Sequence, residues 1–118
     1  MGSMIRRIQQ DARMAQLVEY NGCFETAGQV AADPSCGIVE QTRQVLGSID
    51  ELLSEIGRTK SDLTRVQVWL ADIQYFDELN VEYERWLEGF EKPVRACVES
   101  RLAGPDYLIE VQVFGQAR

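Results

Sequence analysis

Hydrophobic side chains recur along this chain with two different periods, and each change of period marks a change of predicted element. Within residues 63–71 apolar and polar side chains alternate, which indicates a strand with one buried face. Residues 15–20 and 23–30 flank Asn21-Gly22, the strongest two-residue signal for a β-hairpin. The segment 5–8 is also strand-like, so the first part of the chain is predicted to form several short strands.

Two longer segments have the 3.6-residue period of an amphipathic helix instead. The first, 38–56, is followed by Gly57, a residue type that commonly ends helices. The second, 72–89, carries its apolar side chains on one stripe and acidic residues elsewhere. We interpret these carboxylates as a solvated face rather than a metal site, because scattered acids do not make a coordination geometry. They stand at positions 77, 78, 82, 84 and 88.

Residues 93–99 and 108–113 predict two closing strands that carry the most interesting polar side chains. In the first, Arg95 and Cys97 share a face, because side chains two apart in a strand point the same way. In the second, Glu110 opposes its apolar neighbours. If both strands belong to one sheet, Arg95 and Glu110 reach one pocket, where an arginine binds a carboxylate and a glutamate transfers protons.

The order of elements predicts one α+β domain over residues 4–118, with Met1-Gly2-Ser3 as an expression scar. Two helices cover only one face of a mixed sheet of about five or six strands. The second face carries apolar groups, namely Trp69, Leu108 and Phe114. We therefore expect an oligomer, with a pocket between subunits.

The net charge and the lengths of the apolar runs argue against several classes of function. The net charge of −7, from 12 basic and 19 acidic residues, disfavours nucleic acid and anionic membranes as partners. No apolar run approaches the ~20 residues of a membrane span, and no signal peptide follows Met4, so we expect a cytoplasmic protein.

The chain has no histidine, which excludes Ser-His-Asp and Cys-His catalysis and the common zinc and iron sites. We therefore expect no metal. Cys23, Cys36 and Cys97 form no CxxC pair and are predicted to be free thiols in a reducing compartment. Cys97 is interpreted as a small strand residue, since no histidine is present to deprotonate it.

Several short blocks of residues, spaced over most of the chain, form a pattern that is shared with one known family. In order, they are Thr26-Ala27-Gly28-Gln29, Gln41-Thr42, Phe76 with Asn80 and Tyr83, Pro93-Val94-Arg95-Ala96-Cys97-Val98, Gly104-Pro105 and Ile109-Glu110-Val111. Together they resemble the Rid/YjgF family of reactive-intermediate (enamine/imine) deaminases. The sequence resembles a divergent branch, because the best-studied branch has a tyrosine at Met14 and a serine at Ala27.

The resemblance implies a chorismate-mutase-like α+β fold, assembled as a homotrimer with ligand clefts between subunits. It also implies hydrolysis of 2-imino or 2-enamino acids to 2-keto acids and ammonia, with no cofactor. By resemblance, Arg95 grips the substrate carboxylate, Glu110 lies near the reacting carbon and the backbone of Cys97 contacts the substrate. We add Gly28 and Trp69 as further candidates for substrate binding.

Each of these residues also has a structural interpretation. In the structural interpretation, Arg95 would form an ion pair with Glu99 or Glu110, and Glu110 would hold Arg95 in place rather than transfer protons. Trp69 packs in the core or an interface, Gly28 allows a close backbone approach or a bulge, and Asn80 makes a structural hydrogen bond. The alternative function is a non-catalytic trimer that binds small carboxylates or a partner protein. The nuclease activity attributed to some relatives is disfavoured by the charge of −7 and the missing histidines.

Overall fold

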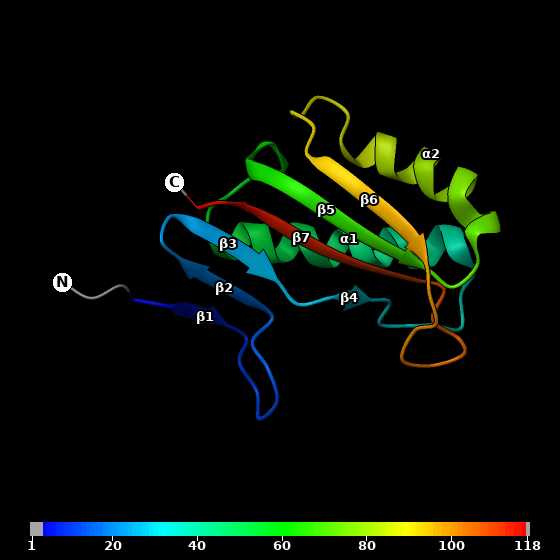
Figure 1. Cartoon of the computed structure of the whole chain (residues 1–118), viewed down its shortest axis with the longest axis horizontal. Helices are drawn as coiled ribbons and strands as arrows, with labels where there is room; N and C mark the ends of the chain where they lie inside the picture. The colour runs from blue at the N-terminus through cyan, green and yellow to red at the C-terminus, as the bar shows by residue number, and fades with distance from the viewer. Residues whose placement is uncertain (1–3, 118) are drawn as a thin grey trace.

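The computed structural model describes residues 4–117, so the predicted expression scar, residues 1–3, and Arg118 lie outside the described residues. The elements of the described chain are β1 (Arg6–Ile8), β2 (Leu17–Tyr20), β3 (Cys23–Thr26), β4 (Gln29–Val30), α1 (Ile38–Glu55), η1 (Lys60–Asp62), β5 (Leu63–Leu70), η2 (Ile73–Tyr75), α2 (Phe76–Trp86), β6 (Val94–Glu99) and β7 (Ile109–Gln116). They form a layer of two α-helices packed against one β-sheet, which is the α+β fold that the pattern predicted (Figure 1).

One mixed sheet contains all seven strands of the described chain, in the order β1-β2-β3-β7-β5-β6, with β4 also paired to β7. β5 and β6 are parallel and α2 connects them, as parallel strands require a long crossover. The other pairs are antiparallel. The last two strands of the sequence are therefore not neighbours, because β5 lies between β6 and β7.

The hairpin at Asn21-Gly22 is confirmed, with φ angles of 50° and 75° at its two residues. The strand predicted over 23–30 is wrong in its continuity, since it divides into β3 and β4. Glu25 pairs with Phe114 and Gln29 with Val111, so four steps on one strand match three on the other. This extra residue is a β-bulge. At the bulge the Val113 N–H donates to Thr26 Oγ1 at 3.1 Å.

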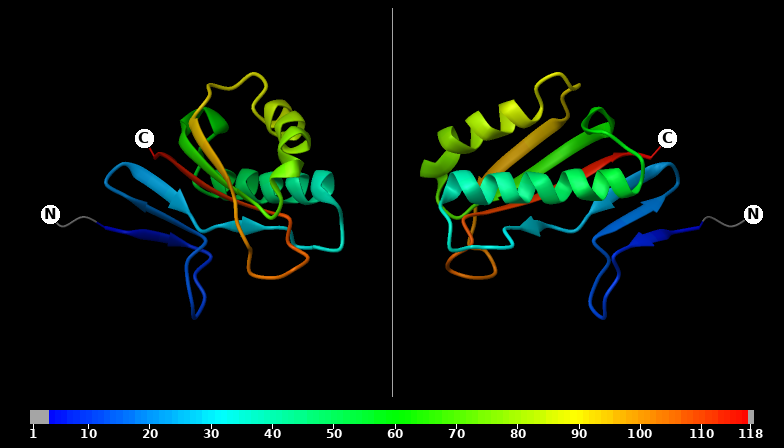
Figure 2. Two further views of the ribbon diagram at one scale, coloured as in Figure 1. Left: turned by 45° about the vertical axis from the view of Figure 1, so that its right-hand side comes forward. Right: turned by 180° about the vertical axis from the view of Figure 1, so that it is seen from behind.

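Both helices lie on the same side of the sheet (Figure 2). α1 follows the prediction closely, and Gly57 ends it with a φ of 68°. α2 is shorter than the predicted segment 72–89, because Asp72 caps a separate 3-10 turn before it. The Asp72 carboxylate accepts a hydrogen bond from the Gln74 N–H at 2.9 Å.

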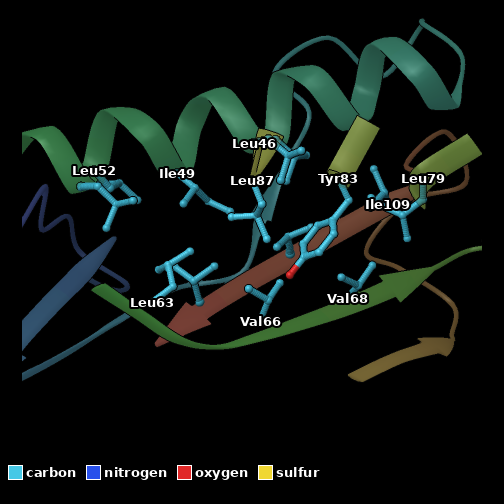
Figure 3. Close-up of a cluster of buried hydrophobic side chains, with 14 of the residues drawn as sticks. Leu46, Ile49, Leu52, Leu63, Val66, Val68, Leu79, Tyr83, Leu87 and Ile109 are labelled. Atoms are coloured by element: carbon cyan, nitrogen blue, oxygen red, sulfur yellow. The ribbon is translucent and has the colours of Figure 1, made fainter. Parts of the chain in front are cut away.

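The core fills the space between the two helices and the sheet (Figure 3). Its buried side chains include Leu46, Ile49 and Leu52 from α1, Leu79 and Tyr83 from α2, Val66 and Val68 from β5, and Ile109 from β7. Leu87, which follows α2, is also buried there. The apolar faces of the helices and of the strands thus pack together in one buried layer.

The second face of the sheet has no helix over it in the described chain (Figure 2). The strand register places on this face Val94, Ala96 and Val98 of β6, Arg65, Gln67 and Trp69 of β5, and Glu110, Gln112 and Phe114 of β7. We call this surface the open face. Trp69 lies there as predicted, but Leu108 does not, because it packs against the core. Val94 is 69% exposed and Val98 45% exposed.

The acidic residues of the second helix are exposed, as predicted, with one exception. Glu82 is buried, and its carboxylate accepts hydrogen bonds from Arg43 of α1 and Arg85 of α2. It was therefore wrong to assign all five acids to a solvated face. Separately, none of the helices within residues 4–117 is long and apolar enough to cross a membrane.

Candidate functional site

Arg95 lies on the helix-covered side of β6, beneath α2. Its guanidinium carbon is 4.7 Å from the centroid of the Tyr83 ring and 5.6 Å from that of Phe76. Its Nη1 donates to Asn80 Oδ1 at 2.8 Å. The predicted structural hydrogen bond of Asn80 is therefore confirmed, and Arg95 is its partner.

These three α2 residues are spaced to face Arg95 together. Phe76, Asn80 and Tyr83 stand at positions i, i+4 and i+7 of the helix, which lie on one face. The sequence pattern had marked Phe76 and Tyr83 as apolar positions, and their aromatic contact with Arg95 was missed. A signal was available: a polar Asn80 within the apolar stripe points to a polar partner beneath the helix.

Arg95 forms no ion pair with a carboxylate in the part of the chain that the structure describes. The predicted alternative pairs with Glu99 and Glu110 are therefore absent from this protomer. Glu99 instead accepts a hydrogen bond from the Ile73 N–H at 2.9 Å. The half-buried cation of Arg95 is held by one neutral amide and two aromatic rings.

Cys97 follows Arg95 on the same face of β6 and is half-buried. Burial raises the pKa of the Cys97 thiol, and the nearby Arg95 charge only partly opposes this effect. The thiol is therefore not activated, which agrees with the prediction of a small strand residue.

Glu110 lies on the open face, where it is directly opposite Trp69 in the register between β7 and β5. Its side chain passes over Gly28 at the β3–β4 bulge. A Cβ atom at Gly28 would overlap Glu110 Oε2. Burial raises the pKa of the Glu110 carboxyl above its ordinary value. Gly28 thus makes the close approach that was predicted for it, with Glu110 as the group that approaches.

Arg95 and Glu110 do not share a pocket within one chain. On β5, Val66 and Val68 point to one face of the sheet and Trp69 points to the other, because side chains alternate along a strand. Arg95 is paired with Val66 and Glu110 with Trp69, so the two side chains lie on opposite faces. The prediction of a common pocket in one sheet was therefore wrong, and within one chain Glu110 does not hold Arg95 in place. The sheet separates the two groups.

Two candidates for substrate binding thus gather around Glu110 and one around Arg95. Trp69 and Gly28 lie beside Glu110 on the open face, whereas Cys97 lies beside Arg95. Ala27 directly precedes Gly28, and Met14 is exposed in the loop between β1 and β2. No cluster of three or more acidic or cysteine side chains that could hold a metal ion occurs within residues 4–117.

Comparison with known proteins places this geometry in a family. The family model described as Endoribonuclease L-PSP matches residues 4–116. A RutC family protein of Haemophilus influenzae is 37% identical over 113 residues, which cover 92% of this chain and 95% of that protein.

Solved structures agree. A member of the YjgF protein family from Neisseria meningitidis has a TM-score of 0.90 at 32% identity and covers 98% of this chain and 96% of its own. A Rid-family protein of unknown function from Yersinia pestis has a TM-score of 0.82 at 26% identity, over 91% of this chain and 90% of its own. The chain therefore belongs to the Endoribonuclease L-PSP family, the group that the short sequence blocks had indicated under its other name, Rid/YjgF.

Proposed function

We propose that this protein hydrolyses 2-imino and 2-enamino acids to 2-keto acids and ammonia in the cytoplasm, without a metal or organic cofactor. Family membership supports this class of reaction. The observation that carries the proposal is the state of Arg95, a half-buried cation with no acidic partner in the described chain.

Arg95 is suited to binding a small carboxylate. The side-chain hydrogen bond that Arg95 makes within residues 4–117 uses Nη1, and the Tyr83 and Phe76 rings support the guanidinium without neutralising its charge. A bound carboxylate supplies the missing negative charge, and a charged hydrogen bond of this kind contributes about 1.5–3 kcal/mol. The fork also fixes the orientation of the substrate.

Glu110 is suited to proton transfer. Its raised pKa brings the carboxyl closer to neutral pH than an ordinary glutamate, so it exchanges protons more readily under working conditions. In our mechanism the Glu110 carboxylate takes a proton from water as the water oxygen bonds to the C=N carbon. Glu110 returns that proton to the nitrogen, which gives a neutral carbinolamine with an NH2 group. The hydroxyl proton then passes to this nitrogen as the C–N bond breaks, so that ammonia leaves and the keto acid remains.

The reaction requires Arg95 and Glu110 to act on one substrate, although the sheet separates them in one chain. We therefore propose a homotrimer in which Arg95 of one copy and Glu110 of the next line a shared cleft. The open face, with exposed Val94 and Val98 and the half-buried Trp69, provides apolar surface for such contacts. A symmetric ring repeats the same cleft at each junction between copies.

In this arrangement the remaining candidates have distinct roles. The backbone of Cys97 binds the substrate beside Arg95. On the adjoining copy, Gly28 makes room for Glu110, and Trp69 lines the end of the cleft that receives the substrate side chain. The net charge of −7 opposes the approach of RNA, so we do not extend the nuclease name of the family to this chain.

Substitution of Arg95 tests the proposal. Ammonia release from freshly generated 2-iminopropionate is measured with metal-free parent protein and with Arg95→Ala. We expect kcat/KM to fall about 10- to 100-fold, which corresponds to one lost charged hydrogen bond. Arg6→Ala is the matched control, since Arg6 is an exposed arginine that forms an ion pair with Glu19.

An unchanged rate in a still-assembled Arg95→Ala protein would contradict the assignment of Arg95. Pyruvate binding by the parent protein without any turnover of the imine would instead favour the non-catalytic trimer. The best-studied branch has tyrosine and serine where this chain has Met14 and Ala27. Pyruvate binding and imine turnover by the parent protein therefore need to be compared directly.

A further inference from the structure

Glu82 is a charged group in a place that the proposed reaction does not explain. The residue is only 7% exposed, on the side of α2 that faces α1. Its Oε1 accepts from Arg43 Nε and its Oε2 accepts from Arg85 Nη1 at 3.1 Å. Both arginine side chains are more than half exposed, so the carboxylate is the buried centre of this cluster.

The hydrogen bonds of Glu82 lower the pKa of its carboxyl, with the bond from Arg43 as the largest cause. The group is therefore ionised at neutral pH. A buried carboxylate that accepts two charged donors has a narrow range of favourable geometry. In contrast, the apolar contacts of Leu79 and Leu87 in the core are non-directional. Two polar contacts of this directional kind join α2 to α1, namely the one between Glu82 and Arg43 and the hydrogen bond that Trp86 Nε1 donates to Asp50 Oδ1 at 3.0 Å. The contact of Glu82 is the buried one of the two, and it resists rotation of α2 against α1.

The rotation of α2 also determines how Arg95 is held. Asn80 and Tyr83 contact Arg95 from the same short helix of 11 residues, within three residues of Glu82. A rotation that releases Glu82 from Arg43 moves both Asn80 and Tyr83 relative to β6. Because Arg95 has no acidic partner to hold it, its guanidinium follows these α2 contacts.

We propose that Glu82, through Arg43, is a positioning residue for the carboxylate anchor Arg95. The inference rests on the proposed function only for its effect on the substrate. Its structural part, that the Glu82–Arg43 contact maintains the stacking of Arg95 on α2, holds for any ligand. The residue blocks that carry the family resemblance do not include Glu82, since on this helix they comprise Phe76, Asn80 and Tyr83.

The structural part is tested by NMR of the Arg95 side chain. Protons held over the Tyr83 and Phe76 rings have upfield-shifted resonances, and Glu82→Gln is expected to move the Arg95 Nε–H and Cδ proton signals back toward random-coil values. Glu84→Gln is the matched control, because it makes the same change at an exposed position of the same helix. Arg43→Gln is the second variant, should Glu82→Gln fail to fold.

The functional part is tested by pyruvate binding and imine kinetics on the same proteins. We expect the pyruvate Kd and the KM for 2-iminopropionate to rise about threefold to tenfold in Glu82→Gln, with kcat changed less than about twofold. Leu52→Ala separates this effect from general destabilisation, because it weakens the core at the far end of α1. It should lower the melting temperature and leave both constants unchanged well below that temperature.

The outcomes distinguish the inference from the function on which it rests. Unchanged Arg95 resonances in both Glu82→Gln and Arg43→Gln overturn the positioning role, whatever the activity. Shifted resonances with unchanged pyruvate affinity also overturn it, since Arg95 would then bind without this support. If the parent protein neither binds pyruvate nor consumes the imine, the proposed function fails, and the resonances still decide the structural part.

Discussion

The Arg95 guanidinium is held by neutral groups within the described chain. A carboxylate partner inside the chain would have satisfied the guanidinium and reduced its attraction for a substrate. Asn80 instead uses one N–H, and the Tyr83 and Phe76 rings stabilise the cation from the side. This arrangement retains most of the positive charge while it restricts the motion of the side chain.

Tyr83 leads to a prediction at the same scale. Its hydroxyl group is buried with no hydrogen-bond partner among residues 4–117, and its oxygen points toward Val66 (Figure 3). A buried hydroxyl without a partner is costly, so Tyr83→Phe should raise the free energy of unfolding by about 1 kcal/mol. Pyruvate affinity should be retained, because the ring under Arg95 remains. Urea denaturation and calorimetric titration measure the two quantities.

The control for the ring is Tyr83→Leu, which removes the aromatic face. It should weaken pyruvate binding about threefold to tenfold, the contribution of one partly buried cation–π contact. A large loss of stability in Tyr83→Phe would contradict this account, because it would mean that the hydroxyl has a partner in the folded assembly.

Glu110 leads to a prediction about pH. Its pKa is raised in the folded chain by burial, so the folded state binds more protons than the unfolded state between the ordinary and the raised pKa. Stability should therefore fall as the pH rises through that window, and Glu110→Gln should remove this fall. The acidic limb of the pH–rate profile should lie above the ordinary glutamate pKa and disappear in Glu110→Gln. A parental rate in Glu110→Gln at neutral pH would refute the proton-transfer role.

Among the elements, the bulge between β3 and β4 determines where Glu110 lies. The prediction concerns Gly28→Ala, whose added methyl group meets the flexible end of the Glu110 side chain. The carboxylate can move aside, so we expect a loss of stability below about 1 kcal/mol but a reduced kcat. Ammonia release and thermal unfolding measure both effects.

Gly47→Ala provides the matched control for this change. Gly47 lies within α1, where an added Cβ has no neighbour within 4 Å. This substitution should raise stability by about 0.5–1 kcal/mol through helix propensity and leave the rate unchanged. If Gly28→Ala retained full activity, the position of Glu110 over Gly28 would not matter for the reaction.

Some elements of the fold were predictable from the sequence and others were not. The long helix 38–55, strand 63–70 and the Asn21-Gly22 hairpin were predictable because their periods and turn residues are local signals. The bulge after Thr26 and the insertion of β5 between β6 and β7 depend on register between distant segments, which no local pattern contains.

For the candidate site, the choice of residues came from local pattern, whereas their placement depends on the pairing of distant strands. Arg95 and Glu110 were chosen as candidates from residue type and motif, and each strand was assigned its alternating faces. Their placement on opposite sides of the sheet follows from pairing with Val66 and Trp69, which lie at positions of opposite orientation on β5. Sequence alone cannot supply that relation, because it depends on strand order. Glu82 was misassigned for a related reason, since its partner Arg43 lies on another helix.

For the whole molecule, the proposed reaction depends on assembly, because the sheet separates Arg95 from Glu110. In our proposal a single copy presents an anchor on one face and a proton carrier on the other, and a ring of three copies brings one of each into every junction between subunits. The open face, which is left without helices in the described chain, is where a neighbouring copy is expected to pack (Figure 2).

The most direct measurement of this central claim is complementation between two inactive variants. Arg95→Ala and Glu110→Gln chains are co-expressed with different tags, and trimers that contain both are purified through the two tags. Every such trimer has one junction in which an intact Arg95 meets an intact Glu110, so imine hydrolysis should return to about one third of the parental rate. A mixed trimer that is no more active than its separate variants would contradict a site shared between copies.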